Sequence, residues 1–121
     1  MSTLRVGVCP RLIAGADRGS VVAEFAVAMP AVLLVLAVLL SGAQVAAVQL
    51  RAQDAAADIA RAWARGEGTP AGVLRGVPGA GTARADSGGL VCATVTGRPS
   101  GVAARLGATV QGTSCALAGG R

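Results

Sequence analysis

The chain has 121 residues, of which 53% are hydrophobic and only 2% aromatic, and its formal charge is +5. All its basic residues are arginines, scattered rather than interleaved with aromatic residues, so the basic excess does not predict nucleic-acid binding. The sequence has no histidine, tyrosine or lysine, no metal-ligand spacing and no phosphate-binding loop, so we expect neither an enzyme nor a cofactor or metal site.

Residues 1–19 form a polar stretch without hydrophobic periodicity, which is typical of a leader or targeting segment. Residues 20–43 follow as an apolar segment with a dense aliphatic block at 31–40. A helix of this length reaches about 36 Å, enough for a hydrocarbon core of about 30 Å. The pattern predicts a transmembrane helix, although equal numbers of arginines on its two sides leave its orientation open.

Glu24 is the only charged residue between Arg18 and Arg51. A carboxylate within a membrane span costs about 2.5 to 3.5 kcal/mol at the helix centre and less near the interface, so it normally signals a partner. Pro30 lies in the same segment and cannot donate a hydrogen bond to the carbonyl of Ala26, which predicts a helix kink.

Residues 44–65 continue the helix as an amphipathic extension. Steps of three and four connect one apolar stripe, formed by Val45, Val48, Ala52, Ala56, Ile59 and Trp63. The same steps connect a charged stripe on the opposite side, formed by Arg51, Asp54, Asp58, Arg61 and Arg65. Gly66, Gly68 and Pro70 predict the end of this helix.

The remainder divides into a Gly/Pro-rich linker at 66–89 and a small strand-containing tail at 90–121. Residues 90–96 are β-branched and predict a strand, 97–101 a turn, and 108–111 and 113–117 two weaker strands, while 102–105 is ambiguous. The sequence therefore predicts an α+β fold, in which one long N-terminal helix precedes a small C-terminal β-hairpin or meander.

Three cysteines occur, of which Cys9 falls in the leader and Cys92 and Cys115 fall in predicted strands. A disulfide between the last two would close a loop of about two dozen residues and stabilise the tail by about 3 kcal/mol. The alternative is two free thiols in a reducing compartment, so the bridge depends on export of the tail.

The apolar block, Pro30 and the surroundings of Glu24 together resemble a known family. Gly19 with a glutamate at the fifth following position, Phe25 beside that glutamate and Pro30 are similar to the N-terminal segment of TadE-like proteins, the minor pilins or pseudopilins of tight-adherence (Flp-type) pilus systems. The resemblance covers about residues 17–60. It implies a protein of the bacterial cell membrane with its tail outside, and as partners a prepilin peptidase, other pilin-like subunits and the inner-membrane assembly platform.

The resemblance also implies roles for single residues. Gly19 would be the last leader residue before the peptidase cut and Ser20 the new amino terminus, while Glu24, next to Phe25, would meet the terminal amine of a neighbouring subunit. Ser20 stands where pilin-like helices often start with a bulky apolar residue, so an uncut membrane accessory stays open as an alternative.

Two other interpretations also stay open. The apolar block can serve as a signal peptide, cut after Ser41, Gly42 and Ala43, which would release residues 44–121 as a small secreted protein. Glu24 would then serve no purpose. Alternatively, the chain is a single-span interaction protein unrelated to pili, whose amphipathic half with Trp63 packs against another membrane component.

Overall fold

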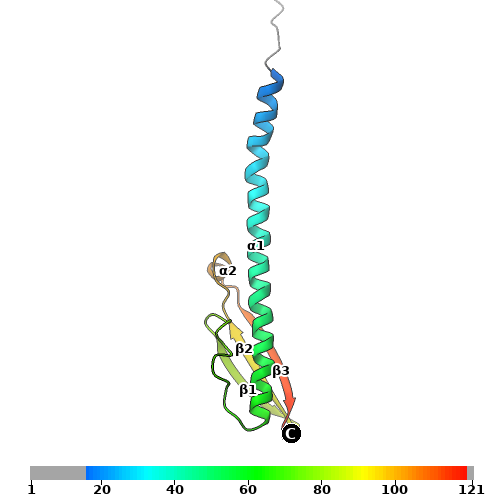
Figure 1. Ribbon diagram of the computed structural model, residues 1–121, viewed down its shortest axis with the longest axis vertical. Coiled ribbons are helices and arrows are strands. Elements are labelled where there is room, and N and C mark those ends of the chain that lie inside the picture. Colours follow the sequence, from blue (N-terminus) through cyan, green and yellow to red (C-terminus); the bar gives the residue numbers. More distant parts are fainter. Residues whose placement is uncertain (1–15, 120–121) are drawn as a thin grey trace, which may run out of the picture. The chain divides into compact units, whose positions relative to one another are not determined.

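The computed structural model describes residues 16–119, so Cys9 and most of the predicted leader lie outside the described residues. A long helix, α1 (Ala16–Ala64), is followed by β1 (Gly81–Ser87), β2 (Leu90–Gly97), a short helix α2 (Val102–Arg105) and β3 (Val110–Leu117) (Figure 1). The α+β class predicted from the sequence is confirmed. The chain divides into two compact units, one up to Leu36 and one from Ala37 onward.

The first unit is the amino-terminal part of α1. The helix begins at Ala16, four residues before the predicted start at Ser20, and contains Pro30. Its large apolar side chains are exposed, as in Val27 and Leu34. By length and composition α1 is able to cross a membrane, and none of its most apolar stretch is buried within the protein. Such exposure is what a helix surrounded by lipid requires.

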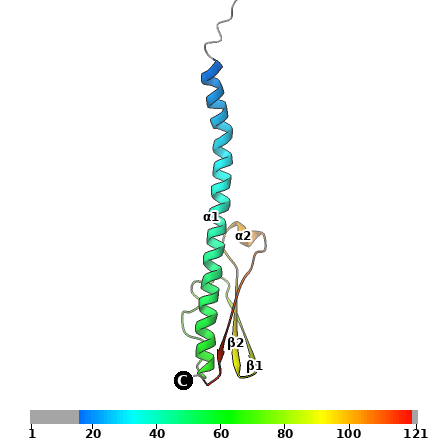
Figure 2. The same cartoon turned by 90° about the vertical axis from the view of Figure 1, so that its right-hand side faces the viewer.

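In the second unit, the carboxyl half of α1 packs on one face of a three-stranded antiparallel sheet with strand order β1-β2-β3 (Figure 2). The core joins the predicted apolar stripe of α1 to inward-facing residues of the sheet. Ala52, Ala56 and Ile59 are fully buried against a cluster that includes Val95 and Val110. The charged stripe on the opposite side of the helix is exposed, as its spacing predicts.

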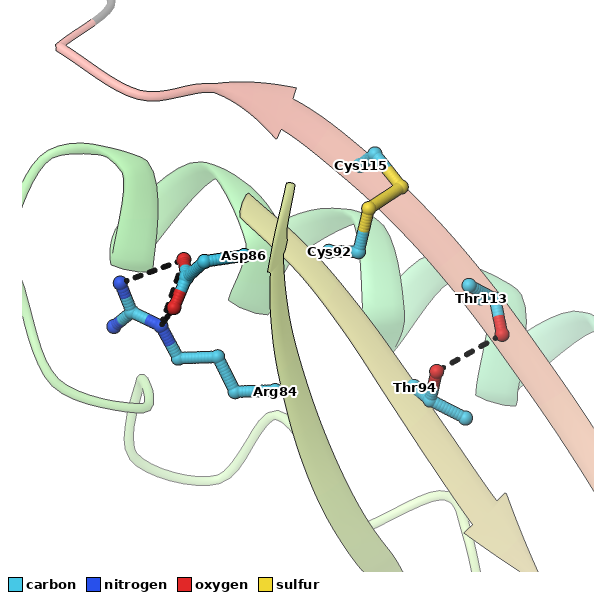
Figure 3. The surroundings of a disulfide bond; sticks show 6 residues. All are labelled: Arg84, Asp86, Cys92, Thr94, Thr113 and Cys115. Atoms are coloured by element: carbon cyan, nitrogen blue, oxygen red, sulfur yellow. Dashed lines mark hydrogen bonds and ion pairs between the residues drawn. A yellow bond between two sulfur atoms is a disulfide. The ribbon is translucent and has the colours of Figure 1, made fainter. Parts of the chain in front are cut away.

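Strands β2 and β3 alternate between a buried and an outer face. Val91, Ala93 and Val95 of β2 are buried beneath α1, whereas Cys92 and Thr94 lie on the outer face. The register places Cys92 opposite Cys115 and Thr94 opposite Thr113, so both pairs share that outer face (Figure 3). A one-residue slip would move the buried valines into solvent, which fixes the register.

Part of the predicted linker at 66–89 is ordered strand and core. Strand β1 lies within it, and Val77 is buried in the core cluster. The sequence did not predict β1 because its residues are mostly exposed, small or charged and show no alternating hydrophobicity. The strand is defined by its pairing with β2. In place of the two weaker strands predicted at 108–111 and 113–117 there is one strand, β3, which begins at Val110, and residues 102–105 form α2.

A glycine in β3 allows the close approach of the sheet to α1. A Cβ atom added at Gly112 would lie 2.5 Å from the carbonyl carbon and oxygen of Ala52 and 2.6 Å from the backbone nitrogen of Gln53. These neighbours are helix backbone and cannot rotate away. We expect Gly112→Ala to destabilise the second unit by about 1 to 3 kcal/mol, as overpacking of a well-packed core does.

Urea unfolding of the full chain in detergent micelles, followed by fluorescence of the single tryptophan, measures this effect. Gly68→Ala is the matched control, because a Cβ atom there meets nothing within 4 Å. Equal unfolding midpoints for the two variants would contradict direct contact between β3 and the backbone of α1.

Candidate processing and assembly site

The amino-terminal site residues lie close together on one helix. Gly19, Ser20, Glu24 and Phe25 all belong to α1 and are exposed. Ser20 and Glu24 are four residues apart and therefore lie on the same side of the helix, one turn from each other. Because α1 already begins at Ala16, the bond between Gly19 and Ser20 lies within its first turns.

Glu24 has no charged residue of its own helix within reach on the carboxyl side. The next charge along α1 is Arg51, which is 27 positions further on (51 minus 24), about 40 Å at the rise of an α-helix. Of the three ion pairs among the described residues, none involves Glu24. Since an isolated carboxylate at the edge of a membrane is unfavourable, its compensating cation has to come from another molecule or from the leader end of the chain.

Pro30 and the two tail cysteines are the remaining residues that the sequence singled out. Pro30 lies inside α1, and the helix continues on both sides of it. Whether it bends the helix stays a prediction. Cys92 and Cys115 are joined by a disulfide on the outer face of the sheet, with their Cα atoms 3.9 Å apart (Figure 3). They belong to the second unit, whereas Gly19, Ser20, Glu24 and Phe25 belong to the first.

Several contacts of the second unit are not predictable from the sequence pattern. The Nε2 of Gln49 donates to the carbonyl of Gln111 at 2.6 Å, and the backbone N–H of Gln111 donates to Oε1 of Gln49 at 3.3 Å. The Gln49 side chain thereby satisfies both backbone hydrogen-bonding groups of Gln111, as the backbone of a neighbouring strand would. Arg84 of β1 pairs with Asp86 at 3.1 Å, and its guanidinium carbon lies 5.6 Å from the centroid of the Trp63 ring.

One surface hollow is lined by charged residues that already pair with each other or with a neighbouring residue. It measures about 450 Å³ and is lined by Asp58, Arg61, Arg65 and residues 70–73. Arg61 pairs with Asp58 at 3.4 Å, and Arg65 with Glu67 at 2.8 Å. The hydrogen bond between Arg65 and Glu67 lowers the pKa of the glutamate and raises that of the arginine, so both stay ionised near neutral pH.

The helical segment is similar to one known protein family. The family model described as TadE-like protein matches residues 19–61, which include Glu24, the apolar stretch and most of the helix that packs on the sheet. The resemblance drawn from Gly19, Glu24, Phe25 and Pro30 is thereby confirmed. No curated protein and no solved structure matches the chain. Residues 19–61, 43 of the 121 residues, are thus similar to TadE-like proteins, and the three-stranded sheet lies outside the match.

Proposed function

We propose that this chain with its TadE-like segment is a minor pilin or pilus-assembly component of a tight-adherence system, anchored by α1 in the bacterial cell membrane with its sheet outside. The observation that carries the proposal is Glu24, a carboxylate with no compensating charge along its helix toward Arg51, set in an exposed apolar run inside the matched segment. A plain anchor has no need of such a residue.

The role that follows is structural rather than catalytic. A prepilin peptidase cuts after Gly19 on the cytoplasmic side, and Ser20 becomes a positively charged amino terminus. The amine of one subunit meets Glu24 of its neighbour, so two groups that are each unfavourable in lipid compensate one another. Because a single such pair is available per contact, it fixes the axial offset between neighbouring subunits. Phe25 and the exposed aliphatic residues then pack between helices, with Pro30 as the bend.

Removal of the carboxylate tests this function. We expect Glu24→Ala and the isosteric Glu24→Gln to abolish incorporation into a surface assembly while membrane insertion stays normal, since each removes the charge and leaves the apolar run around it unchanged. Immunoblots of the sheared surface fraction and of the membrane fraction from the same cells measure the two properties. Asp54→Ala is the matched control, because Asp54 is an exposed carboxylate of the same helix outside the apolar run.

Unchanged surface assembly in both Glu24 variants would overturn the proposal. Amino-terminal sequencing of the membrane-extracted wild-type protein separates the alternatives in the same preparation. A start at Ser20 supports the pilin-like protein, a start at Gln44 supports the secreted protein, and an intact leader supports the uncut membrane protein.

A further inference from the structure

The connection between β2 and β3 exposes apolar side chains that contribute nothing to the core. This connection, residues 98–109, contains α2 and is termed the α2 loop. Val102 is 63% exposed, and Leu106 is 81% exposed, the highest value among the large apolar side chains of residues 19–119. No residue of α2 is buried. These side chains are therefore free to contact something outside the second unit.

The register of β3 along α1 places the α2 loop at one end of the sheet. Gln111 hydrogen-bonds to Gln49, Gly112 abuts Ala52, and the backbone N–H of Gly119 donates to the carbonyl of Ala64 at 3.0 Å. Moving backward along β3 therefore means moving backward along α1. The α2 loop precedes Val110, so it lies at the end of the sheet that is remote from the carboxyl end of α1, as Figures 1 and 2 both show.

That end of the sheet lies near the predicted exit of α1 from the membrane. Gln49 is six positions beyond residue 43, the last residue of the predicted span, which corresponds to about 9 Å of helix. The headgroup layer on each side of the hydrocarbon core is about 5 to 8 Å thick. A loop that extends from Gln111 toward the span therefore reaches the headgroups.

The charge of the α2 loop suits an anionic lipid surface. Arg98 and Arg105 belong to it, and the sequence contains no acidic residue after Asp86. Neither arginine takes part in the three ion pairs among residues 16–119. Exposed aliphatic residues next to unpaired arginines are the composition of segments that lie in a membrane interface with anionic lipid.

We propose that the α2 loop rests on the membrane that α1 crosses, with Val102 and Leu106 among the lipid headgroups and Arg98 and Arg105 facing anionic lipid. The loop then holds the sheet at a fixed height above the bilayer. The inference depends on the membrane span of α1 and not on the pilus role, so loss of assembly in Glu24 variants and failure of this inference are separate outcomes.

Fluorescence quenching by brominated lipid tests the contact. The full chain carries Trp63→Phe together with Leu106→Trp and is reconstituted into vesicles of phosphatidylcholine and phosphatidylglycerol, with or without bromine on the acyl chains. We expect brominated lipid to lower the emission about twofold, as for a residue buried at the boundary of headgroups and acyl chains. Leu117→Trp in the same background is the matched control, because Leu117 is 70% exposed and lies at the opposite end of the sheet. We expect no quenching there.

A second measurement needs no substitution. A photoactivated diazirine lipid, added to vesicles that contain the wild-type chain, is expected to label residues 102–106 and to leave residues 113–117 unlabelled, as mapped by mass spectrometry. Equal quenching or labelling of both ends, or of neither, overturns the inference. A third outcome also overturns the inference: brominated lipid does not quench the emission of the Leu106→Trp variant, and diazirine labelling of residues 102–106 falls as the protein-to-lipid ratio rises. This outcome assigns the loop to a contact with a second copy.

Discussion

Replacing Ile59 by alanine is expected to destabilise the second unit by about 2 to 5 kcal/mol, the range found when a buried isoleucine or leucine is truncated. Ile59 is fully buried in the helix stripe that faces the sheet, and it is among the largest buried side chains of the described residues. Its neighbours in the core cluster are mostly alanines and valines, which are too small to fill the cavity by rotation.

Urea unfolding of the full chain in micelles measures this loss, with Trp63 as the reporter, because that ring packs against the same cluster. Ile59→Val should lower the free energy of unfolding by only about 0.5 to 1.5 kcal/mol, so the two substitutions form a graded series at one site. Leu50→Ala is the control on the same helix, since Leu50 is 66% exposed. If all three variants unfold at the same urea concentration, Ile59 does not lie at the contact between α1 and the sheet.

The sequence predicted the helix and its buried side because both depend on spacing alone. Steps of three and four place Val48, Ala52, Ala56 and Ile59 on one stripe whatever the partner is, and all four are buried. Strand β2 was equally readable, because its β-branched residues alternate between a buried and an outer face. The helix and β2 are therefore recognisable from the periodicity of their own residues.

The sequence did not predict β1 or the burial of Val77, because neither carries a local pattern. β1 is an edge strand that exists through its pairing with β2, and its charged residues Arg84 and Asp86 satisfy each other. Val77 is a single apolar residue among glycines and prolines, and only the path of the chain back along α1 brings it to the core. Both depend on contacts between distant segments, which composition does not encode.

The same distinction between local pattern and distant contacts applies to Glu24 and the α2 loop. Glu24 was readable because a lone charge in an apolar run is conspicuous without any structure. The α2 loop was not, since Val102 and Leu106 become notable only when the register of β3 on α1 places them at the end of the sheet remote from the carboxyl end of α1. Composition therefore predicts the Glu24 site, whereas the α2 loop depends on topology that composition does not encode.

Removing the disulfide is expected to lower the free energy of unfolding of the second unit by about 3 kcal/mol, because Cys92 and Cys115 are separated by 23 positions and the bridge constrains the unfolded chain accordingly. The double variant Cys92→Ala, Cys115→Ala measures this in the urea experiment described for Ile59. Reductant added to the wild-type protein should have the same effect, whereas the double variant should not respond to it.

The neighbouring pair on the same face separates the cross-link from side-chain contact. Thr94 and Thr113 oppose each other on the same two strands, with their hydroxyl oxygens 3.1 Å apart. In the double variant Thr94→Ala, Thr113→Ala the free energy of unfolding should fall by only about 0.2 to 1 kcal/mol, the contribution of an ordinary cross-strand pair. Two results would contradict the disulfide: the cysteine variant loses no more free energy of unfolding than the threonine variant, or both thiols of the wild-type protein react with iodoacetamide before reduction. In either case the tail is held by α1 and strand pairing alone, and the disulfide no longer supports an oxidising environment outside the membrane.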